Sequence, residues 1–145
     1  VYSDQIPLSM ELQKYTYQRC VDMQLEYELV LALMWRESRF QVDAVNINTN
    51  GTQDSGIMQI NDVNRGWLRD QHNITNLMDP VQNINAGTIM LGDLIGKYGV
   101  NDGLMAYQYG EVGMQWQFSK GVYTNENIAI LMSKRKDFQQ ILQQA

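Results

Sequence analysis

The residue whose position most invites chemistry is Glu37. It falls near the end of the segment Glu26–Ser38, whose apolar residues recur at helical spacing and predict a deeply buried helix: Tyr27, Val30, Leu31 and Met34. Burial raises the pKa of a carboxyl group because it disfavours the charged form. A carboxylic acid that stays protonated near neutral pH can donate its proton to a glycosidic oxygen. Taken alone, the position favours a solvated helix-end residue paired with Arg36 or Arg39 over a catalytic acid.

Three short blocks extend the pattern around Glu37. They are Trp35-Arg36-Glu37-Ser38-Arg39-Phe40, then Ser55-Gly56-Ile57-Met58-Gln59-Ile60-Asn61 after a polar loop, and much later Ala106-Tyr107-Gln108-Tyr109-Gly110. The combination resembles the soluble lytic transglycosylase domain of the lysozyme-like superfamily. That family has a Glu-Ser pair, then Gly-Leu-Met-Gln, then Ala-Tyr-Asn-x-Gly. The resemblance runs from about Pro7 to about Leu131, with the blocks in the family's order and spacing.

The resemblance implies a role for each matched residue. Glu37 matches the family's single catalytic acid and base, and Ser38 matches the residue that orients this Glu or a substrate acetamido group. Met58 and Gln59 match a pair that lines the glycan cleft. Tyr107 matches a Tyr that faces the catalytic Glu. For each of these residues except Glu37, packing is the alternative role.

Three positions depart from the family pattern. Gln108 stands in place of the Asn of the third block, so we expect it to bind substrate through a hydrogen bond that its extra methylene shifts. Tyr109 replaces a small residue and is expected to narrow the cleft. Asn127 stands where the family often has a Tyr near the start of the last helix, with Tyr123 nearby. If that Tyr hydroxyl normally supports the catalytic Glu, activity is reduced here.

The resemblance implies a peptidoglycan lytic transglycosylase that cleaves the β-1,4 bond between N-acetylmuramic acid and N-acetylglucosamine. One Glu protonates the glycosidic oxygen and then accepts a proton from the muramoyl 6-hydroxyl, which closes a 1,6-anhydro ring. A hydrolytic lysozyme is the alternative, and it needs a second carboxylate. Asp54 follows Glu37 by seventeen positions, the spacing of the lysozyme type case. Because Ser55-Gly56 comes next, a turn role for Asp54 is favoured over catalysis.

A further alternative is a peptidoglycan-binding module with weak activity or none. The altered Gln108 and Asn127 positions motivate it, and three tryptophans could stack on sugar faces: Trp35, Trp67 and Trp116. Tryptophans in a small domain are more often part of the core.

The elements that must position these residues are predicted to be almost all helical. We expect helices over residues 10–23, 26–38, 61–69, 80–98, 102–109, 113–119 and 125–144. Turn-forming residues between Asp43 and Gly56 predict a long loop or a small irregular hairpin after the catalytic helix. The predicted fold class is mainly α, of the α+β lysozyme-like kind, with one domain over residues 1–145.

The amino-acid composition argues against several classes of binding partner. The net charge is −5, and the only basic run, Lys134-Arg135-Lys136, suits the end of a helix, so nucleic-acid binding is disfavoured. One Cys and one His are too few for a structural zinc site, and we expect no metal or other cofactor. The longest apolar run, Leu29–Trp35, is far shorter than the roughly 18 residues of a membrane span.

The expected partner is therefore a peptidoglycan glycan strand, bound by a monomer outside the cytoplasm. The chain starts at Val1 without an initiator Met, so a removed leader, an anchor or a second domain stays open. Secretion, a place in the cell envelope, surface anchoring through a part outside this chain and a phage origin are all compatible with the sequence.

Overall fold

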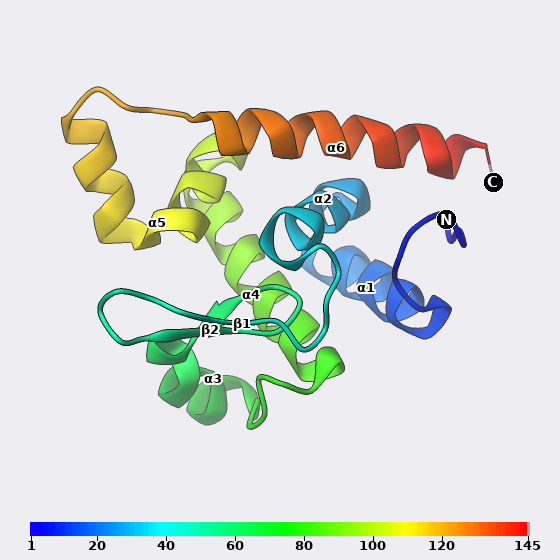
Figure 1. The fold of residues 1–145 in the computed structure, drawn as a ribbon, viewed down its shortest axis with the longest axis horizontal. Helices are drawn as coiled ribbons and strands as arrows, with labels where there is room; N and C mark the ends of the chain where they lie inside the picture. Colours follow the sequence, from blue (N-terminus) through cyan, green and yellow to red (C-terminus); the bar gives the residue numbers. More distant parts are fainter. Residues whose placement is uncertain (145) are drawn as a thin grey trace.

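The fold consists of helices with a small antiparallel sheet at one side, and the computed structural model describes residues 1–144 (Figure 1). The helices are α1 (Met10–Met23), α2 (Tyr27–Ser38), α3 (Arg65–His72), α4 (Pro80–Tyr98), α5 (Val100–Ser119) and α6 (Glu126–Gln143). The strands are β1 (Val45–Ile47), β2 (Gln53–Ser55) and β3 (Ile60–Asn61), and a 3-10 turn, η1 (Asp62–Asn64), leads into α3. The predicted mainly helical class is confirmed.

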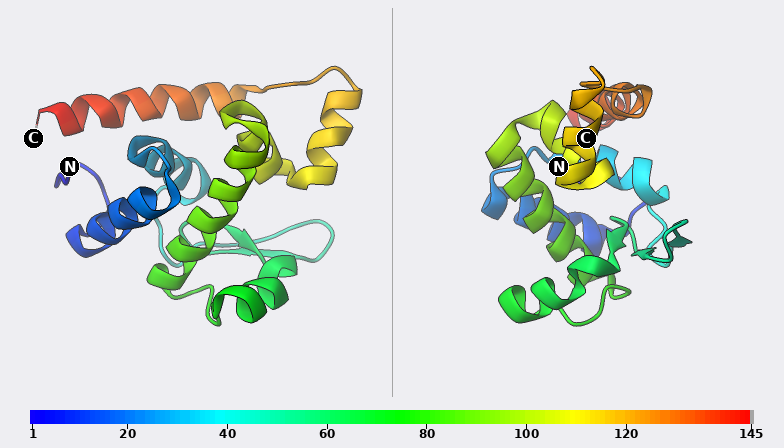
Figure 2. Two further views of the ribbon diagram at one scale, coloured as in Figure 1. Left: turned by 180° about the vertical axis from the view of Figure 1, so that it is seen from behind. Right: turned by 90° about the vertical axis from the view of Figure 1, so that its left-hand side faces the viewer.

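Helix α2 forms the centre of the core. Its five residues from Val30 to Met34 have no exposed surface, because apolar side chains occupy every side of this stretch. Helix α6 lies along α2, and α4 packs on both α1 and α5 (Figures 1 and 2). The helix ends at Arg39, whose φ of 53° turns the chain out of the helix. Glu37 and Ser38 therefore occupy the last turn of a helix whose central residues are fully buried.

The polar segment after α2 forms the small hairpin that the turn formers predict. Strands β1 and β2 pair antiparallel with Asn46 opposite Asp54, and β3 adds to the other edge with Asn61 opposite Asp54. The favoured turn role of Asp54 is wrong, because this residue is the middle of strand β2. The turn instead falls before the strand, around Gly51, whose φ is 87°.

Helix boundaries follow capping residues that the sequence displays. The Asn61 side chain accepts a hydrogen bond from the Val63 amide and caps η1, and Asp79 caps α4 ahead of Pro80. Helix α3 continues to His72, three residues beyond the predicted end. The two short helices predicted over 102–119 form one element, α5, interrupted at Gly110 with φ 76° and ψ 163°. That glycine lets the second half of α5 take its own direction.

Across residues 1–144, no helix has both the length and the apolar character needed to cross a membrane.

Candidate active site

A cleft of about 860 Å³ lies between the sheet side of the molecule and α5. Strand β2, η1 and α3 line one side, and α4, α5 and the first turn of α6 line the other. Glu37 reaches the cleft from the end of α2. The cleft therefore brings residues from segments far apart in the chain together with Glu37.

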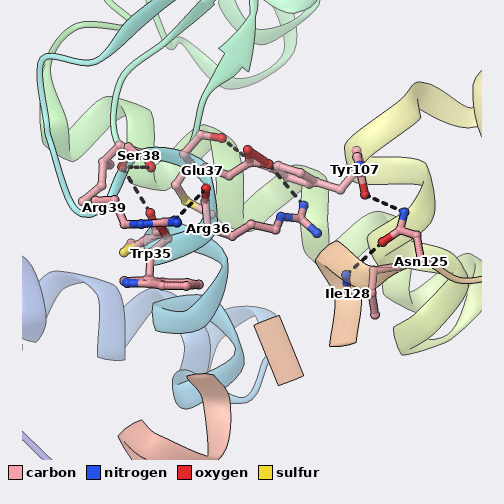
Figure 3. A network of polar contacts seen from close by, with 12 residues as sticks. Trp35, Arg36, Glu37, Ser38, Arg39, Tyr107, Asn125 and Ile128 are labelled. Atoms are coloured by element: carbon pink, nitrogen blue, oxygen red, sulfur yellow. Dashed lines mark hydrogen bonds and ion pairs between the residues drawn. The ribbon is translucent and has the colours of Figure 1, made fainter. Parts of the chain in front are cut away.

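Glu37 is held in a largely buried position beside one cation. Its side chain is 21% exposed, and Arg36 Nη2 donates a hydrogen bond to Glu37 Oε1 at 3.2 Å. Burial raises the pKa of Glu37 above its ordinary value, the Arg36 charge and hydrogen bond oppose this rise, and the charge of Asp54 adds to it. The carboxyl group therefore keeps its proton to higher pH than an ordinary Glu. When it does ionise, the adjacent Arg36 guanidinium stabilises the carboxylate (Figure 3).

Arg36 also lines the cleft, whereas the sequence indicated it only as an ion-pair partner of Glu37. Its side chain is 10% exposed, and among the described residues its Nη1 has no hydrogen-bond partner. The signal was adjacency to Glu37, but adjacent helix residues ordinarily point in different directions. Sequence spacing alone thus could not place the guanidinium group in the cleft.

Tyr107 links helix α5 to the segment before β3. Its hydroxyl donates a hydrogen bond to the Met58 carbonyl at 2.7 Å, and its ring lies beside the Arg36–Glu37 pair (Figure 3). Burial, followed by the nearby Glu37 charge, raises the pKa of Tyr107 well above its ordinary value. Tyr107 therefore stays neutral, and it lines the cleft near Glu37.

Two residues expected to touch substrate lie in the interior instead. The Met58 side chain is fully buried against Gly87, where an added Cβ would lie only 2.3 Å from the Met58 sulfur. The expectation that Met58 lines the cleft is therefore wrong for its side chain. Ser38 is also buried, and its hydroxyl donates to the Ile57 carbonyl at 2.7 Å. It orients the backbone between β2 and β3 rather than Glu37 or a sugar.

Gln59 does line the cleft, and its side chain also holds the hairpin in place. Its Nε2 donates to the carbonyls of Gly56 at 2.9 Å and Ala44 at 3.2 Å. Its Oε1 accepts from Asn46 Nδ2 at 2.8 Å. The backbone of Gln59 has a positive φ of 54°, a conformation that these hydrogen bonds support.

Asp54 lines the same cleft as Glu37. Its Oδ1 accepts a hydrogen bond from Asn61 Nδ2 at 2.9 Å, across the β2–β3 pair. The carboxyl group is therefore oriented by the sheet, and it is close enough for its charge to act on Glu37. Among the acidic residues that line the cleft, Asp54 is the one whose charge contributes to the raised pKa of Glu37.

Gln108 lines the opposite wall, where helices α5 and α6 meet. Its Oε1 accepts from Asn125 Nδ2 at 3.0 Å, and the same nitrogen donates to the Tyr109 hydroxyl at 3.1 Å. Asn127 also faces the cleft. The sequence indicated Asn125 only as the start of the last helix, because its contacts with Gln108 and Tyr109 join segments far apart in the chain.

The three tryptophans have different surroundings. Trp35 does not line the cleft, and the Arg39 guanidinium lies 3.8 Å from its ring centre (Figure 3). The Lys134 ammonium lies 4.9 Å from the same ring centre. Trp116 is 63% exposed but does not line the cleft. Trp67 of α3 lines it and is 42% exposed, so of these three only Trp67 is placed to stack on a bound sugar.

Comparison with known proteins identifies the class. Residues 15–129 match the family described as "Transglycosylase SLT domain", and the chain belongs to this family. The "X polypeptide" of Escherichia coli is 33% identical over 95 residues, which cover 61% of this chain and 54% of that protein. "Protein IpgF" of Shigella flexneri is 50% identical over 42 residues, 29% of this chain and 28% of that protein. The aligned region thus spans about half the length of the X polypeptide.

A solved structure shares the fold. The lytic transglycosylase Slt of Pseudomonas aeruginosa, determined as an inactive mutant, superposes with a TM-score of 0.73 at 17% identity. The superposition covers 96% of this chain and 25% of that one. The lysozyme-like fold predicted from the three sequence blocks is therefore confirmed, and the family is that of glycan-cleaving lytic transglycosylases.

Proposed function

We propose that this chain is a lytic transglycosylase that cleaves the peptidoglycan bond between N-acetylmuramic acid and N-acetylglucosamine. The observation that carries the proposal is the environment of Glu37. Burial in the cleft raises the pKa of this carboxyl group, and the hydrogen-bonded Arg36 stabilises its anion. An acid that must also act as a base needs both influences. The whole of residues 1–145 would serve as one catalytic domain.

The reaction divides into two proton transfers at Glu37. In the first, the carboxyl group donates its proton to the glycosidic oxygen, the bond from C1 to that oxygen breaks, and the N-acetylglucosamine hydroxyl leaves. The new carboxylate is stabilised by the charge and hydrogen bond of Arg36. In the second, the carboxylate takes the proton of the muramoyl 6-hydroxyl, whose oxygen bonds to C1. A 1,6-anhydro ring forms, water is not consumed, and Glu37 is protonated again.

A hydrolytic lysozyme is the second candidate function, and the position of Asp54 favours it. Asp54 lines the same cleft and its charge reaches Glu37, so it could serve as a base or nucleophile in hydrolysis. Asp54→Asn separates the two functions. Activity that survives this change supports the transglycosylase, whereas its loss in a folded variant supports the hydrolase.

The test of the proposal is product analysis on purified peptidoglycan. Mass spectrometry should find muropeptides that end in 1,6-anhydromuramic acid, and Glu37→Gln should yield none. Products with only reducing ends would contradict the transglycosylase. If the unchanged chain binds the wall without cutting it, the chain is a binding module.

The place of action follows from the proposed substrate. Peptidoglycan lies outside the cytoplasmic membrane, so we propose that the chain works there, as a monomer that holds one glycan strand in its cleft. Sedimentation of the purified chain at several concentrations checks the monomer.

A further inference from the structure

The departures at Gln108 and Tyr109 meet at a single side chain, Asn125. This residue caps α6, and its Oδ1 accepts a hydrogen bond from the Ile128 amide at 2.9 Å (Figure 3). Its Nδ2 points the other way and donates to Gln108 and Tyr109. A residue at a helix start thus holds two residues of the cleft wall.

The backbone determines which way this amide faces. A peptide N–H can only donate, so the Ile128 amide requires an acceptor, and only Oδ1 of Asn125 can be one. The Nδ2 group must then face α5. The flipped amide would leave the Ile128 N–H facing a donor, so a main-chain group fixes the orientation of the Asn125 side chain.

The orientation of Gln108 follows in turn. Because Asn125 Nδ2 is a donor, Gln108 must accept with Oε1, its only side-chain acceptor, and the two atoms lie 3.0 Å apart. Its Nε2 group is left with two N–H donors and, among residues 1–144, no protein acceptor. The Tyr109 hydroxyl also accepts from Asn125, so its own proton is free for another group. Both side chains therefore offer donors.

We propose that Asn125 sets the hydrogen-bond polarity of this wall, so that Gln108 donates to the acetamido carbonyl of an N-acetylated sugar in the cleft. The inference rests on the proposed function and specifies which group of the glycan is recognised. Asn125 is a positioning residue that acts through Gln108.

The chemistry of the sugar explains why polarity matters. A sugar hydroxyl can donate or accept, so it is indifferent to the direction of the Gln108 amide. The acetamido carbonyl can only accept, and the ammonium group of a deacetylated glucosamine can only donate. A wall that presents donors therefore binds the acetylated sugar and opposes the deacetylated one. If the wall presented acceptors in place of donors, it should favour the deacetylated sugar over the acetylated one.

Asn125→Asp should reverse the direction of the hydrogen bonds to Gln108 and Tyr109 while keeping the helix cap. Aspartate is as good a capping residue as asparagine, so the Ile128 amide keeps its acceptor. Aspartate cannot donate, however, so Gln108 must turn its Nε2 group toward residue 125 and present Oε1 to the cleft. The Tyr109 hydroxyl turns its proton to the same carboxylate. Both donors are thus withdrawn without a change in fold.

Binding is measured in the Glu37→Gln background, so that no probe is cleaved. The probes are the tetramer of N-acetylglucosamine and the tetramer of glucosamine, titrated by calorimetry or by NMR. We expect Asn125→Asp to weaken binding of the acetylated tetramer about tenfold, the equivalent of roughly 1.4 kcal/mol. The ratio of acetylated to deacetylated affinity should fall, and the melting temperature should stay the same.

Three further variants distinguish the direction of the hydrogen bonds from the effect of charge and from a loss of folding. Thr124→Asp adds the same charge at the neighbouring exposed position and should leave binding of the acetylated tetramer unchanged. Gln108→Glu replaces the donor directly, without touching the cap, and should reproduce the tenfold loss even if Asn125→Asp does not fold. In a Gln108→Met background, Asn125→Asp should weaken binding of the acetylated tetramer much less than it does with Gln108 present.

The proposal is overturned if Thr124→Asp weakens binding of the acetylated tetramer as much as Asn125→Asp does. It is also overturned if Asn125→Asp weakens that binding as strongly in Gln108→Met as with Gln108 present, or if the Glu37→Gln parent binds neither tetramer. Because the probes are not cut, failure here leaves the product analysis of the proposed function intact. Conversely, a chain that fails to form anhydro products can still show the acetamido preference.

Discussion

The two sides of the cleft are held by different kinds of bond. Around Glu37, side chains bind backbone groups in the interior: Ser38 to Ile57, Tyr107 to Met58, and Asn83 to Ser55, Met58 and Leu77. We call this set the Glu37 frame. Across the cleft, the α5–α6 wall is held by contacts between partly exposed side chains, namely Asn125 with Gln108 and Tyr109, and Glu111 with Lys97 and Tyr98.

The two kinds of contact suit two tasks: one side of the cleft positions Glu37, and the other determines which sugar is bound. A buried bond to the backbone is costly to lose, because the orphaned group stays out of water. The frame therefore fixes the acid and tolerates little change. A contact between exposed side chains can be exchanged at small cost. The wall carries Gln108, Tyr109 and Asn127, the positions that depart from the family pattern. We infer that the frame supplies the reaction and the wall adjusts what is bound.

The largest expected effect lies in the frame. Glu37→Gln removes the proton that is transferred while keeping the size of the side chain, and general acid–base catalysis is worth about 10²–10⁴-fold. Release of soluble muropeptides from purified wall should fall by that factor or more, with an unchanged circular dichroism spectrum and melting temperature. Substantial remaining activity would mean that another group is the acid.

Two matched changes, Asn83→Ala and Asn125→Ala, compare the stability of the two regions. Asn83 is fully buried, and its loss orphans three backbone groups, so we expect a cost of about 3 kcal/mol or more in the free energy of unfolding. Asn125→Ala removes a helix cap at the edge of the cleft and should cost only about 1 kcal/mol. Urea unfolding of both variants measures the difference, and equal costs would break the distinction between frame and wall.

A change at Arg36 should move the pH dependence of cleavage. Glu37 must be protonated for the first step, so activity falls as the pH rises through its pKa. Arg36 lowers that pKa, and Arg36→Met should therefore shift the falling side of the pH profile to higher pH. The matched control is Arg39→Met, because Arg39 is exposed and packs over Trp35 instead. A shift in the opposite direction, or an equal one in the control, would contradict the role given to Arg36.

The smallest effect is expected at the far end of the wall. Glu111→Gln breaks an exposed ion pair with Lys97, a kind of contact whose contribution is often too small to measure. The melting temperature should stay within experimental scatter of the parent, both at low salt and in 0.5 M salt. A large fall would show that this contact does fix the second half of α5.

Local signals in the sequence predict most of the fold but only part of the site. Caps and apolar periodicity correctly locate α2, α4 and α6, because these features act within a few residues. The direction of a side chain depends on contacts between distant segments. Met58 packs into the core because Gly87 leaves room for it, and Asn125 meets Gln108 where α5 and the start of α6 lie in contact. Such pairings cannot be read from either segment alone.

The central claim, that Glu37 acts alone as acid and base, is tested most directly by digesting purified peptidoglycan in ¹⁸O-labelled water. We predict 1,6-anhydromuramoyl ends without ¹⁸O, formed equally by the parent and by Asp54→Asn, because the attacking oxygen comes from the sugar itself. Reducing ends that carry ¹⁸O, and that disappear in Asp54→Asn, would contradict the claim and make the chain a two-carboxylate lysozyme.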